Sequence, residues 1–238
     1  MIALQEVTCR FSPQVAAVSN LNLEIRSGET LALLGTSGGG KSTTLKMING
    51  LIRPTSGRVF FEGRPLDYRR IYATRLKMGY VIQEVGLFPH LTVFKNIAIM
   101  ARMLKWEKEK MESRVVELLD LVGLDPKRYL DKFPSQLSGG EGQRVGVARS
   151  LMLDPPCLLM DEPFGALDPI TRSQLQNDFL KLEGLLKKTV VLVTHDVGEA
   201  FKLADRIALM HQGRLIQCDA PEALRSAPVN EFVREFIK

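Results

Sequence analysis

Gly35-Thr36-Ser37-Gly38-Gly39-Gly40-Lys41-Ser42-Thr43 fits the pattern G-x-x-x-x-G-K-[ST], which is typical of a loop that binds phosphate groups. The apolar residues 30–34 before it predict a buried strand, and residues 43–49 after it predict a helix. Glycines let successive backbone N–H groups point inward at a phosphate, and the helix start adds a partial positive charge. We therefore predict that Lys41 reaches the β- and γ-phosphates of a nucleotide and that Ser42 offers its hydroxyl to Mg²⁺. A glycine-rich turn without a ligand is the alternative, and it leaves the flanking strand and helix unexplained.

The composition is that of an ordinary globular protein with one large domain or two small ones. The chain has 238 residues, 45% hydrophobic and 25% charged, and a net charge of +5. No apolar run is long enough to cross a bilayer, and we expect no signal peptide. Cys9, Cys157 and Cys218 are far apart, so we expect reduced thiols rather than a disulfide or metal site. The charge favours an anionic ligand only weakly, and we expect no nucleic-acid partner.

Predicted strands and helices alternate along most of the chain, which indicates an α/β fold. Strands are predicted at 2–8 (an edge or half-buried strand), 21–25, 30–34, 59–63, 79–83, 157–160, 189–193, 206–210 and 214–218. Helices are predicted at 43–49, 69–77, 105–122, 139–153, 170–187, 197–203, 221–225 and 231–237. Gln212-Gly213 predicts a hairpin between the last two strands.

The segment 88–151 differs from the rest because it contains no predicted strand. Its helix 105–122 has one apolar face, formed by Met111, Val115, Leu118, Leu119 and Val122. We therefore predict a single domain over 1–238, in which a core of 1–87 and 152–238 carries a helical subdomain at 88–151.

Two acidic residues follow the predicted strand at 157–160. Ligands of doubly wound sheets bind at the carboxyl ends of the strands. Asp161 could hold Mg²⁺ through water opposite Ser42, and Glu162 could polarise the water that attacks the γ-phosphate. The alternative is a pair of surface acids that open a turn before Pro163.

A second glycine-rich helix start lies at Ser138-Gly139-Gly140-Glu141. Ser138 and Glu141 have the spacing of a capping box, which explains the helix start but not the two glycines. The glycines are expected if the backbone N–H groups approach an anion closely. One nucleotide could need both helix starts, and these need not come from the same copy of the chain.

Three further residues are weaker candidates. His195 follows the predicted strand 189–193 and could donate a hydrogen bond to the γ-phosphate, although a turn or packing role is the commoner one. Gln83 ends its strand and could contact metal or water, and Phe11 could stack on adenine or be an ordinary half-buried aromatic residue. His90 and His211 receive no role.

Together these motifs resemble the nucleotide-binding subunit of ABC transporters over essentially the whole chain. Walker A matches 35–43, the Q-loop Gln83, the signature motif 137–141, Walker B 157–162, the D-loop 166–168 and the switch histidine His195. The signature motif together with Walker A and B distinguishes this family from kinases and GTPases. The resemblance implies a P-loop NTPase fold with a RecA-like core, an antiparallel β subdomain and a helical insert.

The resemblance also implies an ATPase that uses ATP and Mg²⁺ and works as a head-to-tail homodimer. The implied catalytic residues are Glu162, His195, Lys41 and Gln83, and the implied metal ligands are Ser42, Gln83 and Asp161. The implied nucleotide contacts are Phe11, Gly35, Thr36, Ser37, Gly38, Gly39, Gly40, Lys41, Ser42, Thr43, Gln83, Ser138, Gly139, Gly140 and Asp168.

Three stretches, 82–90, 133–136 and 163–172, look like those of importer ATPases for glycine betaine, choline and carnitine. That subgroup implies transmembrane permease subunits, an extracytoplasmic solute-binding protein and a peripheral location on the cytoplasmic face of the cell membrane. We expect no C-terminal CBS modules after Lys238. Gly142 departs from the family's usual glutamine and is expected to weaken the first helical turn.

Other ABC proteins are the competing possibilities. Importer ATPases for amino acids, metals or sugars are the closest competitors. An ABC ATPase of DNA repair would carry a long coiled coil, and a ribosome-directed one would carry two cassettes. A regulator that binds nucleotide without hydrolysis conflicts with the presence of Glu162 and His195.

Overall fold

A computed structural model describes residues 1–12, 14–83 and 86–238. The chain forms two compact units: 1–75 with 159–162 and 187–238, and 76–158 with 163–186. Three residues lie outside the described part of the chain: Pro13, Glu84 and Val85. Glu84 and Val85 belong to the stretch 82–90 that resembles importer ATPases.

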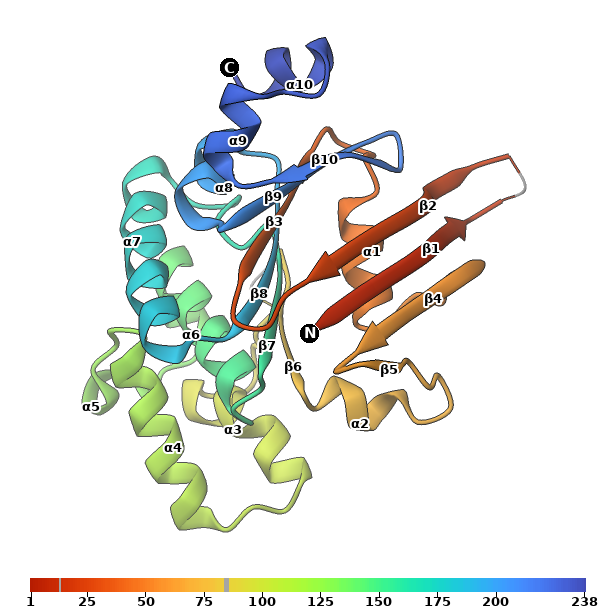
Figure 1. The fold of residues 1–238 in the computed structure, drawn as a ribbon. Helices are drawn as coiled ribbons and strands as arrows, with labels where there is room; N and C mark the ends of the chain where they lie inside the picture. Colours follow the sequence, from red (N-terminus) through yellow and green to blue (C-terminus); the bar gives the residue numbers. More distant parts are fainter. Residues whose placement is uncertain (13, 84–85) are drawn as a thin grey trace. The chain divides into compact units, whose positions relative to one another are not determined.

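The first unit contains an antiparallel sheet and a mainly parallel one (Figure 1). The antiparallel sheet has the order β2-β1-β4-β5, with the bounds β1 (Ile2–Arg10), β2 (Ala16–Ile25), β4 (Ser56–Phe61) and β5 (Arg64–Pro65). The other sheet has the order β10-β9-β3-β8-β7 in this unit, with the bounds β3 (Thr30–Gly35), β7 (Cys157–Asp161), β8 (Thr189–Thr194), β9 (Arg206–His211) and β10 (Arg214–Asp219). Of β7, residues 159–161 belong to this unit. Strand β3 pairs in parallel with β8 and β9, so its carboxyl end lies level with theirs.

Helices cover both faces of the parallel strands. Helix α1 (Lys41–Ile48) packs against β3 and β8 and also against β2 and β4 of the antiparallel sheet. On the other face, Leu34 and Leu209 form a buried cluster with side chains of α8 (Val197–Leu203), α9 (Pro221–Ser226) and α10 (Glu231–Phe236). Every residue of β3 and β8 is buried, as the continuous apolar runs predict.

The predicted α/β fold is confirmed, with small differences at the element ends. Gln212 and Gly213 both have positive φ and join β9 to β10, so the predicted hairpin is confirmed. Strand β1 is half-buried and lies between β2 and β4 rather than at an edge. Several elements differ: β2 begins at Ala16 rather than at residue 21, β5 was not predicted, and the helix predicted at 69–77 is only α2 (Ile71–Arg75). Within 88–151, the helices α3 (Val93–Met103) and α5 (Pro126–Tyr129) were not predicted individually.

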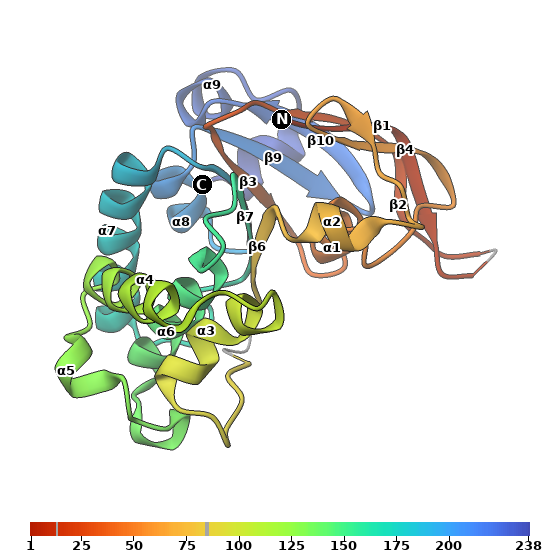
Figure 2. The ribbon, with the colours of Figure 1, turned by 90° about the horizontal axis from the view of Figure 1, so that it is seen from below.

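The second unit is mainly helical, as expected for the segment 88–151. Its elements are β6 (Met78–Val81), α3 (Val93–Met103), α4 (Lys108–Leu121), α5 (Pro126–Tyr129), a 3₁₀ turn η1 (Pro134–Gln136), α6 (Gly139–Leu151) and α7 (Pro169–Leu186). Helices α3, α4 and α6 pack against one another (Figure 2), and α7 packs on α6. The predicted apolar face of α4 is buried except at Met111, which is half-buried.

In the part of the chain that the structure describes, no helix combines the length and apolar character needed to cross a membrane. The three cysteines are all free thiols, and burial raises the pKa of each of them.

Candidate functional site

The phosphate loop connects β3 to α1 in the first unit. The N–H of Gly39 donates to the carbonyl of Thr36 at 3.0 Å, and the hydroxyl of Thr44 donates to the carbonyl of Gly40 at 2.9 Å. Helix α1 has no side-chain cap and no acidic residue in its first turn. Its first N–H groups therefore keep their partial positive charge for an anion.

Two glycines of this loop are required by both conformation and space. Gly35 has φ +152° and Gly40 has φ +93°, which side chains other than glycine rarely adopt. A Cβ atom at Gly35 would lie 2.0 Å from the carbonyl oxygen of Met210, and one at Gly40 would lie 2.5 Å from that of Ala17. The loop can therefore pack this closely on β9 and β2 only with glycine at these positions.

Lys41 lies inside the loop and is 6% exposed. Its ammonium group donates to the carbonyls of Gly35 at 2.8 Å and Thr36 at 2.9 Å. Burial lowers the pKa of Lys41 from its ordinary value, and the carboxylates of Glu162 and Asp161 oppose that shift. The two carbonyls hold the ammonium group of Lys41 in place inside the loop. Its N–H donors are therefore already positioned to bind phosphate oxygens.

Ser42 and Asp161 meet although they are far apart in the sequence. The hydroxyl of Ser42 donates to Oδ1 of Asp161 at 2.9 Å, and Asp161 is 8% exposed. A hydroxyl and a carboxylate are hard oxygen ligands, so this pair fits Mg²⁺, which keeps several waters and takes further oxygens from phosphates. Among residues 1–12, 14–83 and 86–238, no group of three or more His, Cys, Asp and Glu side chains could hold a metal ion. A Mg²⁺ ion at this pair would therefore take its other ligands from water and phosphate.

Glu162 and His195 form the second contact at this edge of the sheet. Nδ1 of His195 lies 3.2 Å from Oε2 of Glu162, and the side chains are 63% and 20% exposed, respectively. Glu162 has φ +46°, and its N–H donates to the carbonyl of Val193 at 3.0 Å. The end of β8 thus holds Glu162 in an unfavourable backbone conformation, a feature that clusters at functional sites.

The first unit therefore contains Asp161, Glu162 and His195 together with all the predicted site residues of 35–43. Phe11 belongs to the same unit and is 65% exposed in the connection between β1 and β2, where a flat ligand could stack on it. Gln83 is exposed and belongs to the second unit, as do Ser138, Gly139, Gly140 and Asp168.

The signature stretch forms the start of α6 with the predicted capping box. The hydroxyl oxygen of Ser138 accepts from the N–H of Glu141 at 3.3 Å, and Oε2 of Glu141 accepts from the N–H of Ser138 at 2.7 Å. Gly140 is buried, and a Cβ atom there would lie 2.6 Å from Cγ2 of Thr171 in α7. Packing within the chain therefore explains Gly140, which sequence reasoning attributed only to an anion.

Gly139 is different because packing within the chain leaves it unexplained. It is exposed, and among the described residues a Cβ atom at this position would meet only Cδ2 of Leu167, at 3.6 Å, an ordinary contact distance. Asp168, the D-loop candidate, accepts the N–H groups of Ile170 and Thr171, both at 3.1 Å. Asp168 thus caps α7. The hydrogen bond from the Thr171 side chain, followed by those from the backbone N–H groups, lowers the pKa of its carboxyl group.

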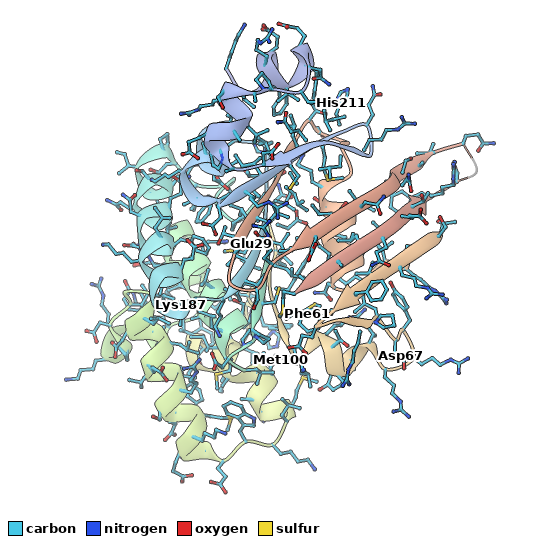
Figure 3. The ribbon with its side chains drawn as sticks, in the orientation of Figure 1. Glu29, Phe61, Asp67, Met100, Lys187 and His211 are labelled. Atoms are coloured by element: carbon cyan, nitrogen blue, oxygen red, sulfur yellow. The ribbon has the colours of Figure 1, made fainter. Side chains whose placement is uncertain are left out.

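His211 is the residue beside this site that sequence reasoning missed. It ends β9 (labelled in Figure 3). The residue before it, Met210, pairs with Gly35. Its Nδ1 lies 3.5 Å from the hydroxyl oxygen of Thr36, and its ring lies 4.3 Å from the ring of Phe232 in α10. His211 therefore connects the phosphate loop to the C-terminal helix.

We expect His211→Ala to lower the free energy of unfolding by about 1 kcal/mol, because it removes an aromatic contact beside the loop. Unfolding in urea, followed by circular dichroism, measures this loss. His90→Ala is the control, since His90 is exposed and contacts Phe88 in the other unit. Equal losses in the two variants would contradict a specific role for His211.

Comparisons with known proteins agree with the geometry. A family model described as ABC transporter matches residues 18–165. The chain is 49% identical over its whole length to the osmoprotectant import ATP-binding protein OsmV of Salmonella typhimurium and to the glycine betaine/carnitine/choline transport ATP-binding protein OpuCA of Bacillus subtilis. These matches cover 63% and 62% of the two relatives, so the chain spans less than two thirds of their length. It is also 47% identical over 99% of its length to the glycine betaine uptake system ATP-binding protein YehX of Escherichia coli, of which it covers 76%.

Two solved structures have the same fold. The structure of cbiO1 from Clostridium perfringens, part of the cbiONQ ABC transporter complex, matches with a TM-score of 0.87 and 30% identity over 94% of this chain and 89% of that one. The dimeric structure of the ATP-binding cassette MJ0796 bound to ADP and Pi matches with a TM-score of 0.82 and 34% identity over 93% of this chain and 99% of that one.

Proposed function

The chain belongs to the ABC transporter family, and from this membership we propose that it is the ATP-hydrolysing subunit of a membrane importer. The observation that carries the proposal is the grouping of Lys41, the Ser42–Asp161 pair and the Glu162–His195 pair in one compact unit. Phosphoryl transfer needs little more from a protein than a phosphate cradle, charge stabilisation and a positioned water.

Each group has a distinct task in the proposed reaction. The N–H groups of residues 38–42 and the ammonium group of Lys41 bind the β- and γ-phosphates of ATP, and Phe11 stacks on the adenine. Glu162 accepts a proton from the attacking water, and His195 donates a hydrogen bond to a γ-phosphate oxygen. The contact between them fixes the imidazole ring beside the carboxylate. Gln83 adds a contact to metal and water.

Ser42 and Asp161, with Gln83, are the residues that would hold Mg²⁺. When bound, the ion supplies positive charge that stabilises the developing charge on the phosphates. The contact between the Ser42 hydroxyl and the Asp161 carboxylate supports this assignment because it already brings two oxygen ligands together.

A second copy of the chain completes the site in this proposal. Ser138, Gly139 and Gly140 of one copy close over the γ-phosphate bound to the other, and Asp168 lets the two sites communicate. Gly139 is exposed, and no packing against the described residues requires a glycine there, which supports a close approach by a ligand or partner at the start of α6. The similar cassette MJ0796 has been solved as a dimer, which supports the same arrangement here.

The transported solute in this proposal is an osmoprotectant of the glycine betaine, carnitine or choline type. The names of the relatives carry this part of the proposal. The subunit would work from the cytoplasmic face of the membrane, with permease subunits and an extracytoplasmic solute-binding protein. Production of the chain with a permease and a solute-binding protein of this transporter type, followed by uptake of labelled glycine betaine into vesicles, tests this. Uptake of an amino acid or sugar instead would overturn the proposed solute.

We expect Lys41→Ala to weaken binding of MgATP by about 10- to 100-fold, because a buried charged donor to phosphate is lost. Titration with a fluorescent ATP analogue measures the affinity. Lys46→Ala is the matched control, since Lys46 is the basic residue in the last turn of the same helix. Unchanged affinity in Lys41→Ala would contradict the assignment of residues 35–43 as the phosphate site.

A further inference from the structure

Tyr129 makes a contact that connects it to the signature motif. Its hydroxyl donates a short hydrogen bond to Oε1 of Glu141, whose other oxygen, Oε2, accepts the N–H of Ser138 at 2.7 Å. Tyr129 is 7% exposed. The carboxylate of Glu141 therefore connects Tyr129 of α5 to Ser138, the N-cap residue of α6.

The start of α6 needs such support because of its composition. Three of its first four residues are glycines, Gly139, Gly140 and Gly142, and glycine in a helix costs up to about 1 kcal/mol relative to alanine. The hydroxyl of Ser138 contributes only a long hydrogen bond of 3.3 Å to the cap. The Glu141 carboxylate is the stronger half of the capping box, since hydrogen bonds to charged acceptors are stronger.

The four N–H groups at this helix start are used in two different ways. Those of Ser138 and Glu141 are satisfied within the capping box. Within the described part of the chain, the N–H groups of Gly139 and Gly140 donate to no other residue. The capping box thus fixes the turn and leaves two adjacent donors for an anion.

Tyr129 is itself held by elements other than α6. Its N–H donates to the carbonyl of Asp125 at 3.1 Å, and its carbonyl accepts the N–H of Lys132 at 3.1 Å. The carbonyl of Lys132 accepts the N–H of Val93 in α3 at 2.8 Å. The Lys132 ammonium group also lies 4.1 Å from the centre of the Tyr129 ring. The phenol is therefore a fixed donor against which Glu141 is aligned.

The protonation states suit this arrangement. The hydrogen bond from Tyr129 lowers the pKa of Glu141 and raises that of Tyr129 itself. The phenol therefore remains a donor, and the carboxylate remains an acceptor, throughout the physiological pH range.

We propose that Tyr129 is a positioning residue for the signature motif, holding Glu141 so that the N–H groups of Gly139 and Gly140 are aimed at the γ-phosphate of ATP bound to a second copy. This inference rests on the proposed function. Tyr129 touches neither nucleotide nor metal, and it acts through Glu141.

The test uses the 238-residue chain carrying Glu162→Gln, so that bound ATP persists. Sedimentation velocity measures the MgATP concentration at which half of the chain is dimeric. Tyr129→Phe removes only the hydroxyl, and we expect this concentration to rise about tenfold, the effect of losing one hydrogen bond to a charged group. Binding of MgATP to the monomer, measured at a protein concentration too low for dimerisation, is expected to stay the same. Tyr72→Phe, at an exposed tyrosine of α2, is the matched control.

A double-mutant cycle separates positioning through Glu141 from general stabilisation. In a chain that also carries Glu141→Ala, Tyr129→Phe is expected to change dimerisation no further. Additive effects, or an unchanged midpoint in Tyr129→Phe alone, would overturn the role of Tyr129. If the Glu162→Gln parent binds MgATP and does not dimerise, the proposed dimer fails, and the inference fails with it.

Discussion

Glu162→Gln is expected to reduce ATP turnover by about 10²- to 10⁴-fold, the usual contribution of a general base. Glutamine keeps the size of the side chain and can still accept a hydrogen bond from Nδ1 of His195. It has no carboxylate to take a proton from water. Binding of MgATP is therefore expected to remain, and the nucleotide-bound dimer should persist because hydrolysis no longer reopens it. Phosphate release and sedimentation velocity on the same samples measure the two effects.

The control for this substitution is Glu62→Gln. Glu62 also has a positive φ, of +51°, but it lies in the turn after β4, where its N–H donates to the carbonyl of Met1 at 2.8 Å. It therefore tests the loss of a carboxylate in the same backbone conformation. Unchanged turnover in Glu162→Gln would exclude Glu162 as the catalytic carboxylate, and the family resemblance alone could not then sustain the proposed mechanism.

Local signals in the sequence were sufficient to predict most of the fold. The run 30–34 is continuously apolar because both faces of β3 are buried, and such a run can be recognised without knowing its neighbours. The hairpin at Gln212 and Gly213 is equally local, since a two-residue turn with positive φ favours glycine. Strand β5 was missed because its two residues, Arg64 and Pro65, are a strand only through their pairing with β4.

Contacts between distant residues account for what the sequence did not reveal. The packing reason for Gly140 depends on Thr171, which lies on another helix. The contact of His211 with Thr36 depends on β9 pairing with β3, a strand order that the alternation of elements does not specify. Glu141 was correctly predicted as part of a capping box because that pattern spans four residues. Its second partner, Tyr129, belongs to a different helix and has no local signature.

Ser138→Trp is expected to raise the MgATP concentration needed for dimerisation by at least about 100-fold. A large side chain at the centre of the proposed interface would prevent the two surfaces from fitting together. Ser138 is exposed, and its hydroxyl serves as the N-cap of α6. A large side chain can therefore project from the chain without disturbing its core, while it occupies the space that a second copy needs. Binding of MgATP to the monomer should be unaffected, because the phosphate loop lies in the other unit.

Loss of the cap must be separated from the added bulk. Ser138→Ala removes the hydroxyl without adding volume, and it is expected to cost about 1 kcal/mol of stability with a much smaller effect on dimerisation. Thr92→Trp makes the same large change at the N-cap of α3 and should leave dimerisation as it is. If Ser138→Trp dimerises with MgATP as readily as the parent, the start of α6 lies outside the interface. The phosphate loop would then have to bind and hydrolyse ATP without Ser138, Gly139 and Gly140 of a second copy.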